Sequence, residues 1–297
     1  MRCACIDIGS NTTALLVADV NGTSVAPIGV RRAFTMIGAS LRDDLISPEK
    51  MLEVQDAVTT FVQQAREMNA DSIRIVATHG VREAVNGGLL ARMVEGRAGL
   101  PVQILTGDEE ARHSFAGASG GAPPTGRVTC VIDAGGGSTE ITWSEPGGEL
   151  RTSSFEIGSS SVLEAFLTSD PPLESEIDAA RARARAIFSD FAVPADCRGA
   201  LVVGGGATTA REIVGGLIDS AAVDRVLAVV TSVSSTTLAE RFKIEWQRAR
   251  LLPAGLIVLA AVSDRIGLPL EVGRGGLREG VVIAMALEAG SPEGLPL

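Results

Sequence analysis

The sequence predicts an α/β fold made of two domains built on a similar plan. Three observations lead to this prediction. Short apolar runs typical of strands alternate with stretches that have a helical pattern. A layout of strand, aspartate, glycine loop, hydroxyl residues and strand starts at Asp7 and returns at Asp133. The stretch GASGGAPPTG, residues 117–126, is typical of a linker. We therefore expect one domain over residues 1–117 and a second over residues 118–297.

The first half of the chain predicts strands and helices in alternation. Residues 2–8 and 14–20 are predicted strands, and Asn21-Gly22 is a strong hairpin signal after the second. A helix is predicted over 47–68, since Ser47 can cap it and Pro48 fits the first turn. A strand (73–78), a helix (81–96), a strand (101–105) and a helix (106–117) follow.

The second half begins with the repeated layout. Strands are predicted over 127–134 and 139–144, with a turn at Pro146-Gly147-Gly148. A polar helix is expected around 173–192, and residues 200–212 predict a strand, a glycine loop and the start of a helix. The chain then predicts a helix (251–266), a strand (268–272) and a final helix (278–289).

Composition excludes several classes of protein. The formal net charge of -10 argues against nucleic acid or an anionic membrane surface as the main partner. The longest apolar stretch, residues 251–262, is too short to span a bilayer, and the N-terminus has no signal-peptide pattern. The four cysteines match neither a zinc site nor a disulfide framework. We expect a soluble protein of the reducing cytoplasm.

Three glycine-rich loops follow predicted strands: residues 7–12 (DIGSNT), 133–139 (DAGGGST) and 203–209 (VGGGATT). Glycine lets the backbone approach a ligand, and successive amides together with Ser or Thr hydroxyls bind phosphate oxygens well. None of the loops has the Gly-Lys-Ser/Thr of a P-loop. A single loop of this kind is explained by a tight turn, but two copies that each follow an aspartate favour a phosphate site.

The segment TGDEEA, residues 106–111, places three carboxylates at the start of a predicted helix. Thr106 and Glu109 have the spacing of a capping box, which accounts for Glu109 structurally. Glu110 lies about 100° further round the helix and can serve another purpose, such as catalysis. Arg82 can pair with either glutamate or bind a phosphate. With only two histidines in the chain, a zinc site is not expected.

Together, DIGSNT, THGVRE (78–83), GDEEAR (107–112), VIDAGGGSTE (131–140), GGGATT (204–209) and GRGGLREGV (273–281) resemble the exopolyphosphatase / guanosine pentaphosphate phosphohydrolase (Ppx/GppA) family. The resemblance implies the actin-like ATPase (ASKHA) fold, with two ribonuclease H-like domains and an active site in the cleft between them. It implies a short form without the HD domain, and family members are often homodimers. It also implies hydrolysis of a terminal phosphoanhydride with Mg²⁺ or Mn²⁺.

Site roles follow from the resemblance, position by position. Glu110 matches the glutamate that orients or deprotonates the attacking water, and Arg82 matches a phosphate-binding arginine. Asp133 and Glu140 match acidic residues of the metal region, with Asp7 as an additional metal contact. The two phosphate loops match Gly9, Ser10, Asn11, Gly135, Gly136, Gly137 and Ser138.

The expected activity is therefore release of phosphate from inorganic polyphosphate, with guanosine pentaphosphate as the alternative substrate. Two further alternatives stay open: a small-molecule kinase, because of GGGATT, and a non-catalytic sensor of polyphosphate or alarmone nucleotides. The sensor is suggested by Met36, which stands where the family often has arginine, and by a short segment over 231–255. Arg31, Arg32 or Arg42 are candidates to replace that arginine.

Overall fold

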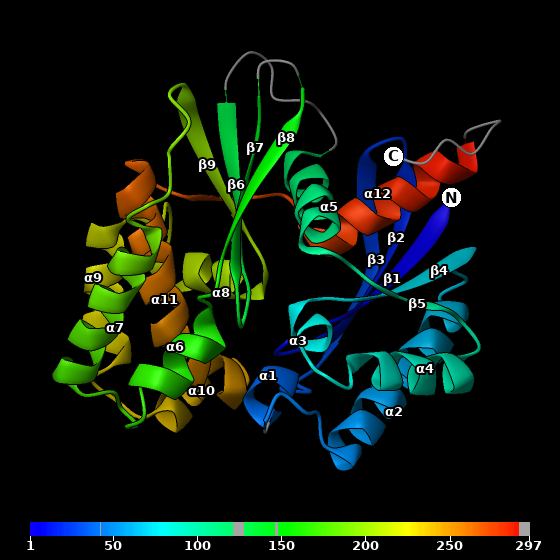
Figure 1. Ribbon diagram of the computed structural model, residues 1–297, viewed down its shortest axis with the longest axis horizontal. Helices are drawn as coiled ribbons and strands as arrows, with labels where there is room; N and C mark the ends of the chain where they lie inside the picture. The colour runs from blue at the N-terminus through cyan, green and yellow to red at the C-terminus, as the bar shows by residue number, and fades with distance from the viewer. Residues whose placement is uncertain (42, 121–127, 146–147, 291–297) are drawn as a thin grey trace. The chain divides into compact units, whose positions relative to one another are not determined.

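The computed structural model describes residues 1–41, 43–120, 128–145 and 148–290. The chain divides into two compact units, one of Met1–Ala122 with Arg274–Leu297 and the other of Pro123–Gly273. Each unit contains one five-stranded mixed sheet with helices (Figure 1). The expected α/β class is confirmed.

The sheet of the first unit has the strand order β3-β2-β1-β4-β5. Its strands are β1 (Arg2–Ile8), β2 (Thr13–Asn21), β3 (Ser24–Ala33), β4 (Ser72–Ala77) and β5 (Val102–Ile104). The first three strands form an antiparallel meander, whereas β4 is parallel to β1 and β5 is parallel to β4. Because parallel strands end on the same side, β1, β4 and β5 share one edge, which we call the carboxyl edge of the first sheet.

Helices cover both faces of this first sheet. They are α1 (Ile37–Ser40), α2 (Pro48–Glu67), α3 (His79–Arg82), α4 (Gly87–Ala98), α5 (Gly107–Ser119) and α12 (Leu277–Gly290). Side chains alternate along β1, so Ala4 and Ile6 pack in a core with residues of α2 and α4. On the opposite face, Cys3 and Cys5 pack with Val281 of α12.

The single helix predicted over 81–96 is wrong. Helix α3 ends at Arg82 and α4 begins at Gly87. The chain turns back between them, so closely that a Cβ at Gly87 would lie 1.9 Å from the carbonyl oxygen of Val81. Only glycine fits this approach, and a continuous helix would not make it.

The C-terminal helix α12 belongs to the first unit, whereas the expected boundaries grouped it with residues 118–297. It packs against α5 with the two backbones in contact. A Cβ at Gly117 would lie 2.0 Å from the Gly276 oxygen, and one at Gly280 would lie 1.8 Å from the His113 oxygen. Figure 1 shows α12 and α5 side by side. Helix α5 runs on to Ser119, into the expected linker, and the rest of that linker from residue 121 lies outside the described residues.

The second unit repeats the sheet of the first. Its strand order is β8-β7-β6-β9-β10, with the same pattern of antiparallel and parallel neighbours. The strands are β6 (Val128–Ala134), β7 (Thr139–Ser144), β8 (Leu150–Phe155), β9 (Cys197–Val203) and β10 (Glu271–Val272). The layout seen twice in the sequence therefore corresponds to two copies of one topology. The predicted turn at 146–148 falls largely outside the described residues.

One large apolar cluster forms the core of the second unit. Its helices are α6 (Ser159–Phe166), α7 (Glu174–Phe188), α8 (Gly205–Val214), α9 (Ser220–Val230), α10 (Ser235–Phe242) and α11 (Trp246–Ile266). Helix α11 packs against all five of the other helices of this unit. Among the described residues, no helix is long and apolar enough to cross a membrane. All four cysteines are buried and none forms a disulfide.

Glu176, in the first turn of α7, gives a test of this unit's stability. Hydrogen bonds from the Thr168 hydroxyl and the Leu173 amide lower the pKa of Glu176 to about 2. A lowered folded-state pKa stabilises the protein above the unfolded pKa of about 4.3, and this contribution is lost as the pH falls towards 2. Glu176→Gln should therefore lower the urea midpoint at pH 7 and have a shrinking effect at pH 5, 4 and 3. Glu174→Gln is the control, and a pH-independent difference would contradict the account.

Candidate active site

The first glycine loop connects β1 to β2 at the carboxyl edge of the first sheet. Gly9 N donates to Thr12 O at 2.9 Å and closes the turn. The carbonyl oxygens of Ser10 and Asn11 accept from Gly38 N and Met36 N at 2.9 and 3.0 Å. These bonds hold the loop against the segment that leads into α1. Met36, at the position where the resemblance led us to expect an arginine, thus lies directly beside this loop.

Helix α3 lies against the same loop. A Cβ at Gly80 would be only 2.9 Å from Ser10 Cα, so the two backbones are in contact. Thr78, just before α3, donates its amide to Ile8 O at 3.2 Å. Arg82, at the end of α3, is therefore held close to the first loop. Only the glycine at position 80 hinted at this contact in the sequence.

Arg82 pairs with Glu110, one of the two alternatives left open by the sequence. Its Nη1 donates to Glu110 Oε2 and to Leu105 O, both at 2.9 Å, and its Nε lies 3.3 Å from Glu83 Oε1. Glu110 is only 8% exposed. Burial lowers the pKa of Arg82, but the hydrogen bond and charge of Glu110 outweigh it and raise that pKa overall. The pair is thus a charge-assisted contact in a partly buried position.

Glu109 has the structural role that its spacing predicted. It accepts from the Thr106 amide at 2.8 Å, while the Thr106 hydroxyl accepts from the Glu109 amide at 3.2 Å. The Thr106 amide lowers the pKa of Glu109. The capping box fixes the first turn of α5 and turns Glu110 to the other side, towards Arg82.

In the second unit, Asp133 and Glu140 are direct partners across β6 and β7. Side chains of directly opposed residues point to the same face of a sheet, so the two carboxylates share a face. Glu140 is 3% exposed, and its Oε1 accepts from the Ser154 hydroxyl at 2.9 Å. This arrangement provides a pair of acidic groups on the two strands that the second glycine loop connects.

The second loop is held by the start of α6. Gly135 O accepts from Ser159 N at 3.0 Å, and Gly136 O accepts from Ser160 N at 2.8 Å. A Cβ at Gly158 would lie 2.4 Å from the Gly136 oxygen, so this approach requires glycine. Gly135 N in turn donates to the oxygen of Ser138, which is buried. Gly137 completes the loop.

The third glycine loop lies next to the second, because β9 is the parallel neighbour of β6. Gly204 has φ of +99°, and a Cβ there would lie 3.5 Å from Asp133 Oδ1. Arg248, from the start of α11, donates to the Thr209 hydroxyl at 2.8 Å. The GGGATT motif predicted this loop in the sequence, but none of its residues was expected in the site.

The acidic side chains of the second unit are candidates for holding a metal ion. Within the described part of the chain, no three His, Cys, Asp or Glu side chains are grouped closely enough to hold a metal. Asp133 and Glu140 nevertheless form a pair of hard oxygen donors on one face. Mg²⁺ is commonly held by one or two carboxylates, with phosphate oxygens and water completing its shell. The pair fits such an ion.

The expected site residues fall into two sets. The first unit carries Asp7, the first loop, Arg82 and Glu110, all at or beside one sheet edge. The second unit carries Asp133, Glu140 and the second loop. Of the candidates to replace the missing arginine, Arg31 and Arg32 are exposed on β3, and Arg42 lies outside the described residues.

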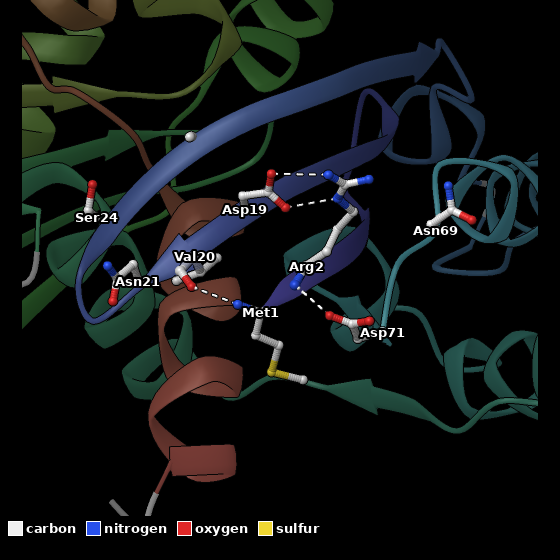
Figure 2. Close-up of a pocket in the computed structure, with 9 residues that line it drawn as sticks. Met1, Arg2, Asp19, Val20, Asn21, Ser24, Asn69 and Asp71 are labelled. Carbon is white, nitrogen blue, oxygen red and sulfur yellow. Dashed lines mark hydrogen bonds and ion pairs between the residues drawn. The ribbon is translucent and has the colours of Figure 1, made fainter.

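A hollow at the opposite edge of the first sheet has a different character (Figure 2). It is lined by the start of β1 and the end of β2. Its cations are the Met1 ammonium, which donates to Val20 O at 3.1 Å, and Arg2, whose guanidinium Asp19 binds at 2.8 and 3.1 Å and which also donates to Met68 O. Since these cations have partners within the fold, we assign this hollow a structural role.

The sequence matches the Ppx/GppA phosphatase family over residues 16–289. The chain belongs to this family. The Ppx/GppA enzyme of Aquifex aeolicus is 25% identical, with a TM-score of 0.77, over 96% of this chain and 99% of that one. An exopolyphosphatase from Cytophaga hutchinsonii is 20% identical, with a TM-score of 0.82, over 96% and 97% of the two chains. An exopolyphosphatase-like protein is 22% identical, with a TM-score of 0.84, over 97% and 100%.

Membership of the Ppx/GppA phosphatase family implies a phosphatase, which is a hydrolase. The actin-like fold expected from the motifs is confirmed by the repeated sheet and by the full-length match to these structures. The two structures below 25% identity support the fold alone. Met36 of this Ppx/GppA phosphatase lies beside the first loop, where its amide donates to Asn11 O.

Proposed function

We propose that this Ppx/GppA phosphatase is an exopolyphosphatase that hydrolyses the terminal phosphoanhydride bond of inorganic polyphosphate. The observation that carries the proposal is the placement of Glu110. It is buried, held by Arg82 at 2.9 Å, and positioned at the sheet edge that bears the first glycine loop. A buried carboxylate fixed in this way suits a general base that orients or deprotonates water.

In this proposal the first loop, through Gly9, Ser10 and Asn11, and the second, through Gly135 to Ser138, bind phosphate oxygens. Arg82 keeps its contact with Glu110 and also binds the anionic end of the substrate. Asp133 and Glu140, with Asp7 as a further contact, hold Mg²⁺ or Mn²⁺. The bound ion would neutralise charge on the phosphate oxygens. The remaining contributions are positioning and hydrogen bonding by the chain itself.

Guanosine pentaphosphate is the alternative substrate, because its terminal phosphoanhydride presents the same chemistry. A non-catalytic sensor is a second alternative, and Met36 beside the first loop is the observation that favours it. A kinase has weaker support, since only the third loop suggests it.

Steady-state phosphate release from polyphosphates of several lengths, from guanosine pentaphosphate and from ATP separates these functions. We expect the highest kcat/KM on polyphosphate, with Mg²⁺ present and a loss of rate in EDTA. A higher kcat/KM on guanosine pentaphosphate would make that compound the substrate in place of polyphosphate. Binding of either compound without phosphate release would favour the sensor.

A further inference from the structure

Arg278 lies in the first turn of α12, within the motif GRGGLREGV, and no role has been assigned to it above. Its Nη1 atom is buried and has no hydrogen-bond partner among the described residues. Arg278 as a whole is only partly buried, but an enclosed donor atom such as this one nearly always has an acceptor. Leaving a charged donor buried without an acceptor is costly. The fold therefore leaves the charge of Arg278 without full compensation, and because the residue is partly exposed, an anion from outside the chain can approach its guanidinium.

The surroundings of Arg278 place it on the Asp7 face of the first sheet. Cys3, Cys5 and Asp7 alternate along β1 and so point to one face, where Cys5 packs with Val281 of α12. Arg278 precedes Val281 by three residues, so both lie on the same side of the helix. Burial raises the pKa of the Cys5 thiol, the charge of Asp7 raises it further, and Arg278 lowers it. Arg278 and Asp7 are thus both within electrostatic range of one thiol.

The charges of the first unit favour a substrate-binding role for Arg278. Arg82 is shared between Glu110 and Glu83, so its charge is largely compensated within the protein. Asp7 and Glu110 are acidic, and a polyphosphate end adds several more negative charges. Besides the metal ion and Arg82, a cation whose charge the fold has not already neutralised would strengthen binding of this end near the carboxyl edge. Arg278 has an unused donor and lies on the correct face.

We propose that Arg278 is a second phosphate-binding arginine, whose guanidinium donates to a substrate oxygen near Asp7. The inference rests on the proposed function and extends it, because it assigns to α12 a direct part in holding the anionic substrate. In the absence of substrate the unpaired donor destabilises the protein, and bound phosphate relieves this.

The test is calorimetric binding of tripolyphosphate with Mg²⁺ present, in a Glu110→Gln background in which turnover is slow. Arg278→Gln should weaken binding about 10- to 100-fold, the range for losing a hydrogen bond to a charged group. Arg278→Lys should recover part of the affinity. Arg274→Gln, an exposed arginine four residues earlier, should bind as the background does. The thermal midpoint of unliganded Arg278→Gln should be equal or higher, because a buried unpaired donor is removed.

An unchanged affinity for tripolyphosphate in Arg278→Gln would overturn the inference. If the thermal midpoint were also lowered, the role of Arg278 would be purely structural. Failure of the proposed function would be seen in a different measurement, as absence of phosphate release from polyphosphate by the wild-type protein. If the wild-type protein hydrolyses polyphosphate while Arg278→Gln retains the same KM, only the role of Arg278 fails.

Discussion

Glu110→Gln should reduce phosphate release from polyphosphate by about two to four orders of magnitude, the usual contribution of a general base. Glutamine has the same shape, and its amide oxygen can still accept from Arg82 Nη1, which lies 2.9 Å from Glu110 Oε2. The change therefore removes the negative charge and basicity with little change in packing. The loss should appear in kcat, with KM much less affected, measured by steady-state phosphate release.

Glu109→Gln is the matched control, since it changes the neighbouring carboxylate on the same helical turn. Glu109 belongs to the capping box with Thr106, and because glutamine also serves at this position, the change should have a small effect on stability and leave kcat nearly unchanged. Near-normal turnover in a folded Glu110→Gln protein would contradict the assigned role. Equal losses in both variants would point to damage to α5 rather than to a missing base.

Gly280→Ala should destabilise the protein by about 3 kcal/mol, the upper part of the usual range for overpacking. The added methyl would lie 1.8 Å from His113 O and 2.5 Å from His113 C, and both atoms belong to the backbone. Neither can move aside as a flexible side chain would, so α12 must shift away from α5. Urea unfolding followed by circular dichroism measures the change.

Gly96→Ala provides the control for the same substitution in a helix. A Cβ at Gly96 in α4 meets nothing within 4 Å, and alanine has the better helix propensity. This variant should be more stable by about 0.5 to 1 kcal/mol. If Gly280→Ala were as stable as Gly96→Ala, the close contact between α5 and α12 would be wrong.

Local patterns in the sequence were enough to predict much of the fold. The strands around Asp7 and Asp133, the cap at Ser47 and the capping box at Thr106 depend on near neighbours, and all are confirmed. The break between α3 and α4 was missed, because it depends on the approach of Gly87 to Val81 rather than on propensity.

Contacts between distant parts of the chain could not be predicted from spacing. Arg82 had two adjacent glutamates as possible partners, and only the turn of α5 selects Glu110. The membership of α12 in the first unit depends on glycines of two helices, Gly117 and Gly280, that are far apart in the sequence. For the same reason the unpaired Nη1 of Arg278 had no sequence signal beyond its motif. The catalytic and metal-binding roles of the site residues stay predictions.

Hydrolysis of polyphosphate in ¹⁸O-labelled water tests the central claim most directly. The account predicts Mg²⁺-dependent release of phosphate that carries one labelled oxygen per turnover, with the signal reduced in Glu110→Gln by the same factor as kcat. Absence of phosphate release from polyphosphate by the wild-type protein, or transfer of phosphate to an acceptor without label, would contradict it.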